Sequence, residues 1–124
     1  MRIWDLPPSI LCRQHLLGEH RELHGLWNIL VLGKTGYSHH PETLRWVGKL
    51  RALYNRHATL VEEMERRGYN HATPLDKRRA KGVPHQDERL ISLRAQRALL
   101  TSKGCSCGSS FEERPRGQVR PVRL

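Results

Sequence analysis

Cysteine is scarce in this sequence, and so are the long apolar runs that membrane proteins need. The 124 residues include three cysteines, at Cys12, Cys105 and Cys107. An odd number with one close pair does not form a disulfide framework, so we expect the protein to work in the reducing interior of a cell. Cys105 and Cys107 have no second pair of ligands at the spacing of a zinc site. The first residues, MRIWDLPPS, lack the apolar core of a signal peptide. The longest apolar stretch, residues 26–32, is short and interrupted by Asn28, so no membrane-spanning segment is expected.

Acidic residues are also few. The chain has 22 lysines and arginines against 12 aspartates and glutamates, which gives a formal net charge of +10. A globular protein with this excess usually meets a polyanion: nucleic acid is the first candidate and an anionic membrane surface the second. A ribosome-associated or simply soluble basic protein remains an alternative. The length is that of one domain.

The sequence has no strand pattern and no internal repeat. Instead, its apolar residues recur at the spacing of a helix. Helical patterns cover residues 9–32, 41–67 and 84–102. Ser9 is a plausible N-cap of the first, and Gly33 ends it. We therefore expect an all-α fold: a single compact domain over residues 1–104 with three main helices, an extended N-terminal arm at residues 1–8, and a polar, disordered tail at residues 105–124.

The middle helical pattern has the clearest apolar stripe. Its members are Val47, Leu50, Tyr54, Val61 and Met64, and Gly68 followed by Tyr69 is a typical stop. His57 falls on this stripe, where a core histidine is more common than a metal ligand. Other positions carry the basic residues, which are expected either to be solvated or to face a phosphate backbone: Arg45, Lys49, Arg51, Arg56 and the run at residues 77–81.

The stretch from Arg13 to Trp27 has two unlike faces. The apolar face consists of Leu16, Leu23, Trp27 and Leu30, and the opposite face consists of Gln14, His15, Gly18, Arg21, Glu22 and Gly25. Each glycine costs about 1 kcal/mol of helix propensity relative to alanine, which favours a close approach to the backbone there. A carboxylate among basic and amide groups suggests a site; the alternative is an ordinary charged outer face.

The segment Gln14–Leu23 reads QHLLGEHREL. It resembles the QHL-x-x-E-x-REL signature of the phage pyrimidine-dimer DNA glycosylase/AP lyase family, often called endonuclease V. The pair Arg2-Ile3 resembles the residues just after that family's mature N-terminus. The stretch from His40 to Tyr69 resembles its second long helix, and Val83-Pro84-His85 resembles a Pro-His before its last helix. The resemblance covers about residues 1–100 and is strongest in the first quarter of that range.

The resemblance implies a nucleophile and a catalytic carboxylate. The nucleophile is the α-amine of the first residue, which attacks C1′ of the damaged nucleotide and forms an imine. That residue is Met1, which we expect to be retained because Arg2 is bulky. An α-amine has a pKa of about 7.8, so roughly a tenth is unprotonated at pH 7, against less than about a thousandth for lysine. Glu22 matches the carboxylate that stabilises the oxocarbenium-like sugar. Gly18, one turn earlier, would leave room for the arm.

Four more residues match family positions that bind the DNA backbone or organise the site: Arg2, Gln14, His15 and Arg21. Gly25 stands where the family has a phosphate-binding arginine, and we expect His24 to replace it in part. The family's aromatic-rich C-terminal segment is also missing. Dimer specificity is therefore less firmly implied than the imine chemistry, which an abasic-site lyase or another glycosylase would share. No cofactor and no metal ion is expected, because an imine route activates no water.

Together these features predict a DNA repair glycosylase with AP lyase activity on damaged pyrimidines. Its partner would be double-stranded damaged DNA and not a membrane, and the protein would be a cytoplasmic or nucleoid-associated monomer. One alternative is a non-catalytic module that binds nucleic acid, associated with RNA or the ribosome, on the same fold. Another is a metal-dependent nuclease using His39, His40, Glu42 or His71, although these residues follow no recognised ligand spacing.

Overall fold

The computed structural model describes residues 2–33, 39–70 and 73–103. In this part of the chain four α-helices follow one another: α1 (Arg13–Leu32), α2 (Pro41–Leu44), α3 (Leu50–Arg66) and α4 (Leu93–Ser102). Two 3-10 turns complete the elements: η1 (Pro8–Ile10) precedes α1, and η2 (Lys77–Arg79) lies between α3 and α4. The described residues contain no strand, only an isolated bridge between Lys49 and Gly82. The prediction of an all-α fold with three main helices is thus confirmed, and α2 is a short addition.

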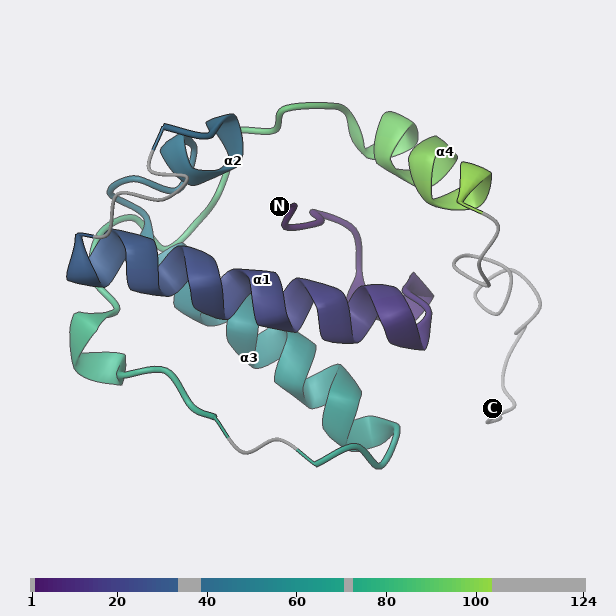
Figure 1. Cartoon of the computed structure of the whole chain (residues 1–124), viewed down its shortest axis with the longest axis horizontal. Coiled ribbons are helices and arrows are strands. Elements are labelled where there is room, and N and C mark those ends of the chain that lie inside the picture. Colours follow the sequence, from purple (N-terminus) through teal and green to yellow (C-terminus); the bar gives the residue numbers. More distant parts are fainter. Residues whose placement is uncertain (1, 34–38, 71–72, 104–124) are drawn as a thin grey trace.

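Helices α1 and α3 form the centre of the fold. They run in opposite directions and cross, with the N-terminal segment on the other side of α1 in this view (Figure 1). Their interface contains leucines with no exposed surface: Leu16, Leu23 and Leu26 from α1, and Leu53 and Leu60 from α3. Burial of one such side chain contributes about 1.5–3 kcal/mol, so this interface contributes strongly to stability. Two of the three leucines on the predicted apolar face of α1, Leu16 and Leu23, belong to this interface.

Helix α1 begins later than predicted. The chain makes the turn η1, extends at Leu11 and enters the helix at Arg13, with Cys12 rather than Ser9 as N-cap. Ile10 and Leu11 are both buried in this arrangement. The guanidinium of Arg67 donates to the carbonyl of Leu11 at 2.7 Å and to that of Pro8 at 3.3 Å, so the backbone groups freed by the break are satisfied. The predicted end at Gly33 is confirmed.

The single helix predicted over residues 41–67 is wrong, because the chain breaks between α2 and α3. Gly48 has a φ of +77°, a left-handed conformation that favours glycine. Its carbonyl accepts from Val83, and Gly82 approaches so closely that a Cβ there would lie 2.2 Å from the Gly48 oxygen. The amide of Arg51 then donates to the carbonyl of Lys81 at 2.8 Å. A distant segment therefore supplies the acceptors that the start of α3 needs.

The last helix is shorter than the predicted 84–102. It begins at Leu93, where the side chain of Ser92 accepts from the amide of Ala95 at 3.1 Å. Residues before it run as an extended segment, and Gln86 donates to the carbonyl of Arg45 at 2.7 Å. No helix in the described part of the chain is long and apolar enough to cross a membrane. The predicted tail at residues 105–124 lies outside the described residues.

The N-terminal segment is part of the core rather than a loose arm. Ile3, Trp4 and Leu6 are all buried. In Figure 1 this segment lies between α1 and the extended green segment that leads into α4. Its position matters for the site, because it brings the amide of Arg2 to Glu22 of α1.

Candidate active site

Four successive backbone amides of the N-terminal segment are each bound by a side chain from a helix. The acceptors are Glu22 for Arg2 at 3.2 Å, Glu42 for Ile3 at 3.3 Å, Glu19 for Trp4, and Gln96 for Asp5 at 2.9 Å. These acceptors come from α1, α2 and α4, so three helices fix the same short segment. A chain end is usually poorly ordered unless it is tied down in this manner. The segment that follows Met1 is therefore held in one place, beside the carboxylate of Glu22.

A buried ion pair supports this segment from the α2 side. Glu42 is 1% exposed and accepts from Arg45 at 2.7 Å and from the indole of Trp46 at 3.1 Å. Arg45 also donates to the carbonyl of Ile3 at 2.8 Å and to Asp5 at 3.1 Å. Burial alone would lower the pKa of Arg45, but Glu42 and Asp5 together raise it above its usual value, so the guanidinium stays charged.

A second ion pair joins α1 to α3 under the same segment. Arg56 binds Glu19 with two hydrogen bonds of 2.6 and 3.0 Å and donates to the carbonyl of Leu6 at 2.9 Å. Burial raises the pKa of the Glu19 carboxyl, while Arg56 and the Trp4 amide act in the opposite direction. Arg45 and Arg56 were expected to be solvated or to face phosphate. That expectation is wrong for both, because each neutralises a buried carboxylate.

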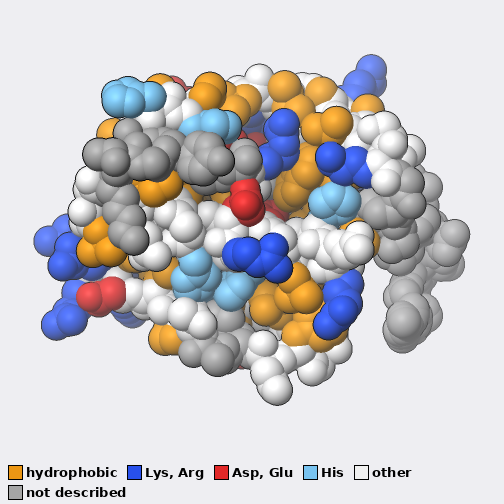
Figure 2. Space-filling view, in the orientation of Figure 1, with side chains coloured by type: hydrophobic (Ala, Val, Ile, Leu, Met, Phe, Trp, Pro, Cys, Tyr) orange, Lys and Arg blue, Asp and Glu red, His pale blue; other side chains and the backbone are white. Residues whose placement is uncertain are grey.

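An open pocket of about 520 Å³ lies where the N-terminal segment meets α1. It brings Arg2 of the N-terminal segment together with five residues that the sequence assigned to one face of the helix: Gln14, His15, Gly18, Arg21 and Glu22. Lys103 adds a further positive charge at this pocket. Figure 2 shows a face of the molecule on which acidic side chains lie among lysine, arginine and histidine side chains. A half-buried carboxylate next to several cations is an arrangement that suits an anionic substrate.

His15 is a histidine of the pocket with a shifted pKa. Burial, and then the positive charge of Lys103, lower the pKa of its imidazole. Its Nδ1 lies 3.2 Å from the sulfur of Cys12, and its ring meets that of Trp4 edge-on at 6.0 Å. The guanidinium of Arg2 lies over the same indole, 5.2 Å from the ring centre. These contacts orient both His15 and Arg2 at the pocket.

Two expectations concern His24 and Gly18 of α1. His24 does not line the pocket; its Nε2 lies 3.2 Å from that of His57 on α3. The expected phosphate contact of His24 stays a prediction, and the structure offers His57 as the partner of its Nε2. Gly18 lines the pocket, but a Cβ there would meet no atom of the described residues within 4 Å. The close approach of the arm to Gly18 is absent from the described part of the chain, and the glycine simply widens the pocket.

The residues proposed for a metal-dependent nuclease are not gathered into a metal site in the described part of the chain. Glu42 is occupied by Arg45, and His40 accepts the amide of Glu42 at 3.0 Å as the N-cap of α2. His71 lies outside the described residues. The described residues do contain one group of three side chains close enough to hold a metal ion, formed by His20, His24 and His57.

Sequence reasoning missed the residues that hold the N-terminal segment, namely Glu19, Glu42 and Gln96. One signal was present: Glu19 falls on the apolar side of α1, between Leu16 and Leu23, where a carboxylate must have a partner. Nothing in the sequence identifies that partner as Arg56, because 37 positions separate the two residues.

The fold and pocket define a small helical protein that fixes its N-terminal segment beside a carboxylate at a basic pocket. A family model described as pyrimidine dimer DNA glycosylase matches residues 1–77. The chain therefore belongs to the pyrimidine dimer DNA glycosylase family, as the resemblance had indicated. No curated protein and no solved structure matches the chain.

Proposed function

We propose that this protein is a DNA glycosylase with AP lyase activity that acts on damaged pyrimidines, in particular pyrimidine dimers. The observation that carries the proposal is the hydrogen bond from the Arg2 amide to Glu22, in a pocket rich in cations. Only the Cα and carbonyl carbon of Met1 separate its α-amine from that amide. In a chain that begins at Met1, the amine is thus tethered close to the carboxylate. Family membership supports the same activity.

The α-amine of Met1 is the nucleophile. Its lone pair forms a bond to C1′ as the glycosidic bond breaks and the base leaves with the bonding electron pair. Opening of the sugar then gives the imine and a hydroxyl at C4′. Removal of a proton from C2′ and departure of the 3′-phosphate complete the β-elimination, and water releases the enzyme. These steps are balanced without a cofactor.

Glu22 stabilises the positive charge that develops on the sugar and transfers the protons of these steps. The hydrogen bond from the Arg2 amide holds this carboxylate near the N-terminal segment, so the carboxylate and the α-amine can act on the same sugar. Arg2 and Arg21 bind the phosphates that flank the lesion, and Gln14 and His15 organise the pocket. His24 has no part in this assignment, because it points toward α3.

The substrate is double-stranded DNA with the damaged nucleotide accessible at the pocket. Extrusion of a nucleotide costs least at a damaged site, where stacking and pairing are already weakened. The net charge of +10 supplies affinity for the phosphate backbone at any sequence. Gly25, exposed on α1, offers no phosphate contact at the place where the family carries an arginine.

Trapping of the imine tests the proposal. Untagged protein that begins at Met1 is incubated with duplexes carrying an abasic site or a cyclobutane pyrimidine dimer, borohydride is added, and the cross-linked peptide is mapped by mass spectrometry. We expect an adduct on the α-amine of Met1 from both duplexes. Protein acetylated at that amine is the matched control and should give none.

The other outcomes are equally informative. An adduct from the abasic duplex alone would retain the lyase and exclude dimers as the substrate. An adduct on a lysine would reject Met1 as the nucleophile. Tight DNA binding with no adduct would leave a non-catalytic nucleic-acid-binding module as the function.

A further inference from the structure

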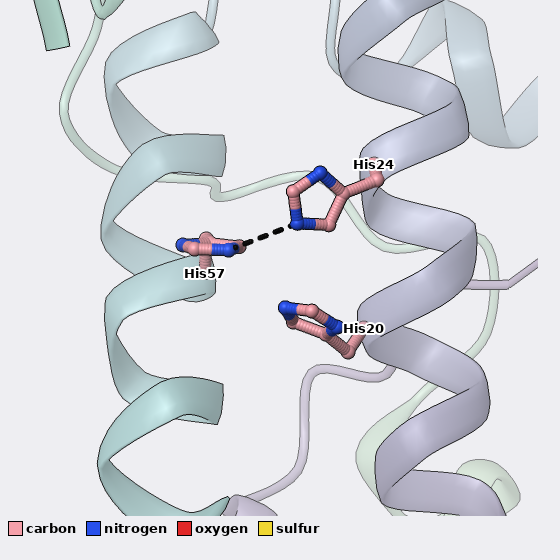
Figure 3. Close-up of side chains that lie close together, drawn as sticks. All are labelled: His20, His24 and His57. Atoms are coloured by element: carbon pink, nitrogen blue, oxygen red, sulfur yellow. Dashed lines mark hydrogen bonds between the residues drawn. The ribbon is translucent and has the colours of Figure 1, made fainter. Parts of the chain in front are cut away.

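Three histidines meet between α1 and α3. His20 and His24 lie on successive turns of α1, and His57 faces them from α3 (Figure 3). The ring centres are 4.7 Å apart for His20 and His24, 5.1 Å for His20 and His57, and 5.0 Å for His24 and His57. One ring nitrogen from each lies within 4.8 Å of the others. His57 is 5% exposed, and the two histidines of α1 are half-buried.

We propose that His20, His24 and His57 bind a divalent transition-metal ion, with Zn²⁺ the ion that fits best. Imidazole nitrogen is a preferred ligand of Zn²⁺ and its neighbours in the first transition row. A tetrahedral ion with Zn–N bonds of about 2.0–2.1 Å holds its ligand nitrogens about 3.3–3.4 Å apart. The Nε2 atoms of His24 and His57 are already 3.2 Å apart. The third ligand nitrogen, on His20, lies within 4.8 Å of the other two.

Two features of the helices favour this site. Residues four positions apart on a helix lie on the same face, so α1 presents His20 and His24 as a pair toward α3. Glu19 directly precedes His20 on α1, and Arg56 directly precedes His57 on α3. The bidentate ion pair between Glu19 and Arg56 therefore joins the two helices beside the histidines. His57 is thereby held opposite the pair on α1 before any ion binds. This preorganisation lowers the cost of closing the metal site.

The site is separate from the proposed chemistry. None of the three histidines lines the pocket that contains Glu22. Three protein ligands leave one tetrahedral position for water. Since the ligands come from both central helices, the ion ties α1 to α3 and stabilises the folded state, while base release proceeds through the amine and carboxylate.

Metal binding is measured on the full-length, untagged protein by titration with Zn²⁺ in a calorimeter and with Co²⁺ by absorption. The test variants are His20→Gln and His24→Gln, which alter half-buried side chains, and circular dichroism verifies that each is folded. His85→Gln, at an exposed histidine outside the cluster, is the matched control. Cys105→Ser/Cys107→Ser removes the thiols of the tail as a second source of ligands.

We expect one ion per chain, tetrahedral Co²⁺ absorption without thiolate charge-transfer bands, and a higher melting temperature with Zn²⁺. Each cluster variant should weaken binding by more than about 100-fold, because even loss of an outer-shell partner costs 10–100-fold. His85→Gln and the double serine variant should bind as the parent does. Absence of binding to the parent would overturn the proposal. So would binding that survives in a folded cluster variant, or that disappears with the tail thiols.

Discussion

Glu22 combines two roles that are usually divided between residues. One carboxylate oxygen accepts the amide of Arg2 at 3.2 Å and so locates the start of the chain. The same side chain lines the basic pocket in which the proposed reaction takes place. A substitution that tests the chemical role of Glu22 must therefore keep its hydrogen bond to Arg2 and remove only its charge. Glutamine does so, because its amide oxygen can still accept from Arg2 but carries no negative charge.

For Glu22→Gln we expect base release from dimer-containing DNA to fall by about 10²–10³-fold, the usual cost of removing one group that stabilises transition-state charge. Single-turnover strand cleavage measures the rate, and a binding titration should show nearly unchanged affinity for DNA. Glu65→Gln, at an exposed position of α3, is the matched control and should be fully active. Full activity in Glu22→Gln would show that this carboxylate has no role in the chemistry.

The protonation of His15 should make the stability of the fold depend on pH. Burial and Lys103 lower the pKa of His15, so its imidazole should titrate below about 6.5. The folded state then binds this proton less tightly than the unfolded chain, and stability is lost as the pH falls from about 6.5 through the folded pKa. NMR titration of the ring measures the pKa directly.

Lys103→Met should raise the pKa of His15 toward its ordinary value by removing the neighbouring charge. Lys81→Met removes an exposed lysine elsewhere and should leave the titration of His15 unchanged. An equal response to both substitutions would mean that the effect of Lys103 is only a change in net charge.

At the scale of elements, the N-terminal segment is a component of the helical assembly. Its amides bind side chains of α1, α2 and α4, and its carbonyls accept from arginines of the α2–α3 region. Arg45 is central because it neutralises Glu42 and binds the carbonyl of Ile3. The position of the N-terminal segment at the pocket therefore depends on Arg45, although Arg45 does not line the pocket.

Replacement of Arg45 by methionine should lower the free energy of unfolding by about 3–5 kcal/mol, because Glu42 would remain as a buried charge without its cation. Urea denaturation monitored by circular dichroism measures the loss. Arg89→Met, at an exposed site, should stay within about 0.5 kcal/mol of the parent.

The double variant Glu42→Gln/Arg45→Met removes both charges and should recover part of the lost stability. A loss below about 1 kcal/mol in Arg45→Met would indicate that water or another cation compensates Glu42. The ion pair would then be unnecessary for fixing the N-terminal segment.

Across the whole molecule, the positive charges fall into two groups. Arg45 and Arg56 are neutralised in buried ion pairs, whereas Arg2, Arg21 and Lys103 line the pocket. In the proposed function, long-range attraction to DNA comes from the total charge, while the cations at the pocket set the position of the duplex.

DNA affinity should therefore fall steeply as salt rises, with a linear dependence of log K on log salt concentration. Arg21→Gln should reduce the slope of that line by about 0.9, the value for one lost phosphate contact on duplex DNA. Arg21→Lys keeps the charge and should keep the slope. If Arg21→Gln left the slope unchanged, Arg21 would not contact a phosphate, and the duplex would lie elsewhere on the surface.

Local signals in the sequence determined much of the fold. Periodicity located the cores of the three main helices, and Gly33 and Gly68 marked where α1 and α3 end, because such stops depend only on neighbouring residues. Spacing on a single helix also sufficed to place Gln14, Arg21 and Glu22 together, since a helix fixes the relation of residues three to eight positions apart. All three line one pocket.

The tertiary structure alone decided the partners across the fold. Glu19 meets Arg56, Asp5 meets Gln96, and Gly48 is forced against Gly82, all over separations that no local pattern encodes. The same holds for His57, which the sequence marked only as a residue of an apolar stripe. Its encounter with the histidines of α1 depends on how α1 and α3 cross, and that crossing is set by packing of whole helices rather than by the sequence of either one.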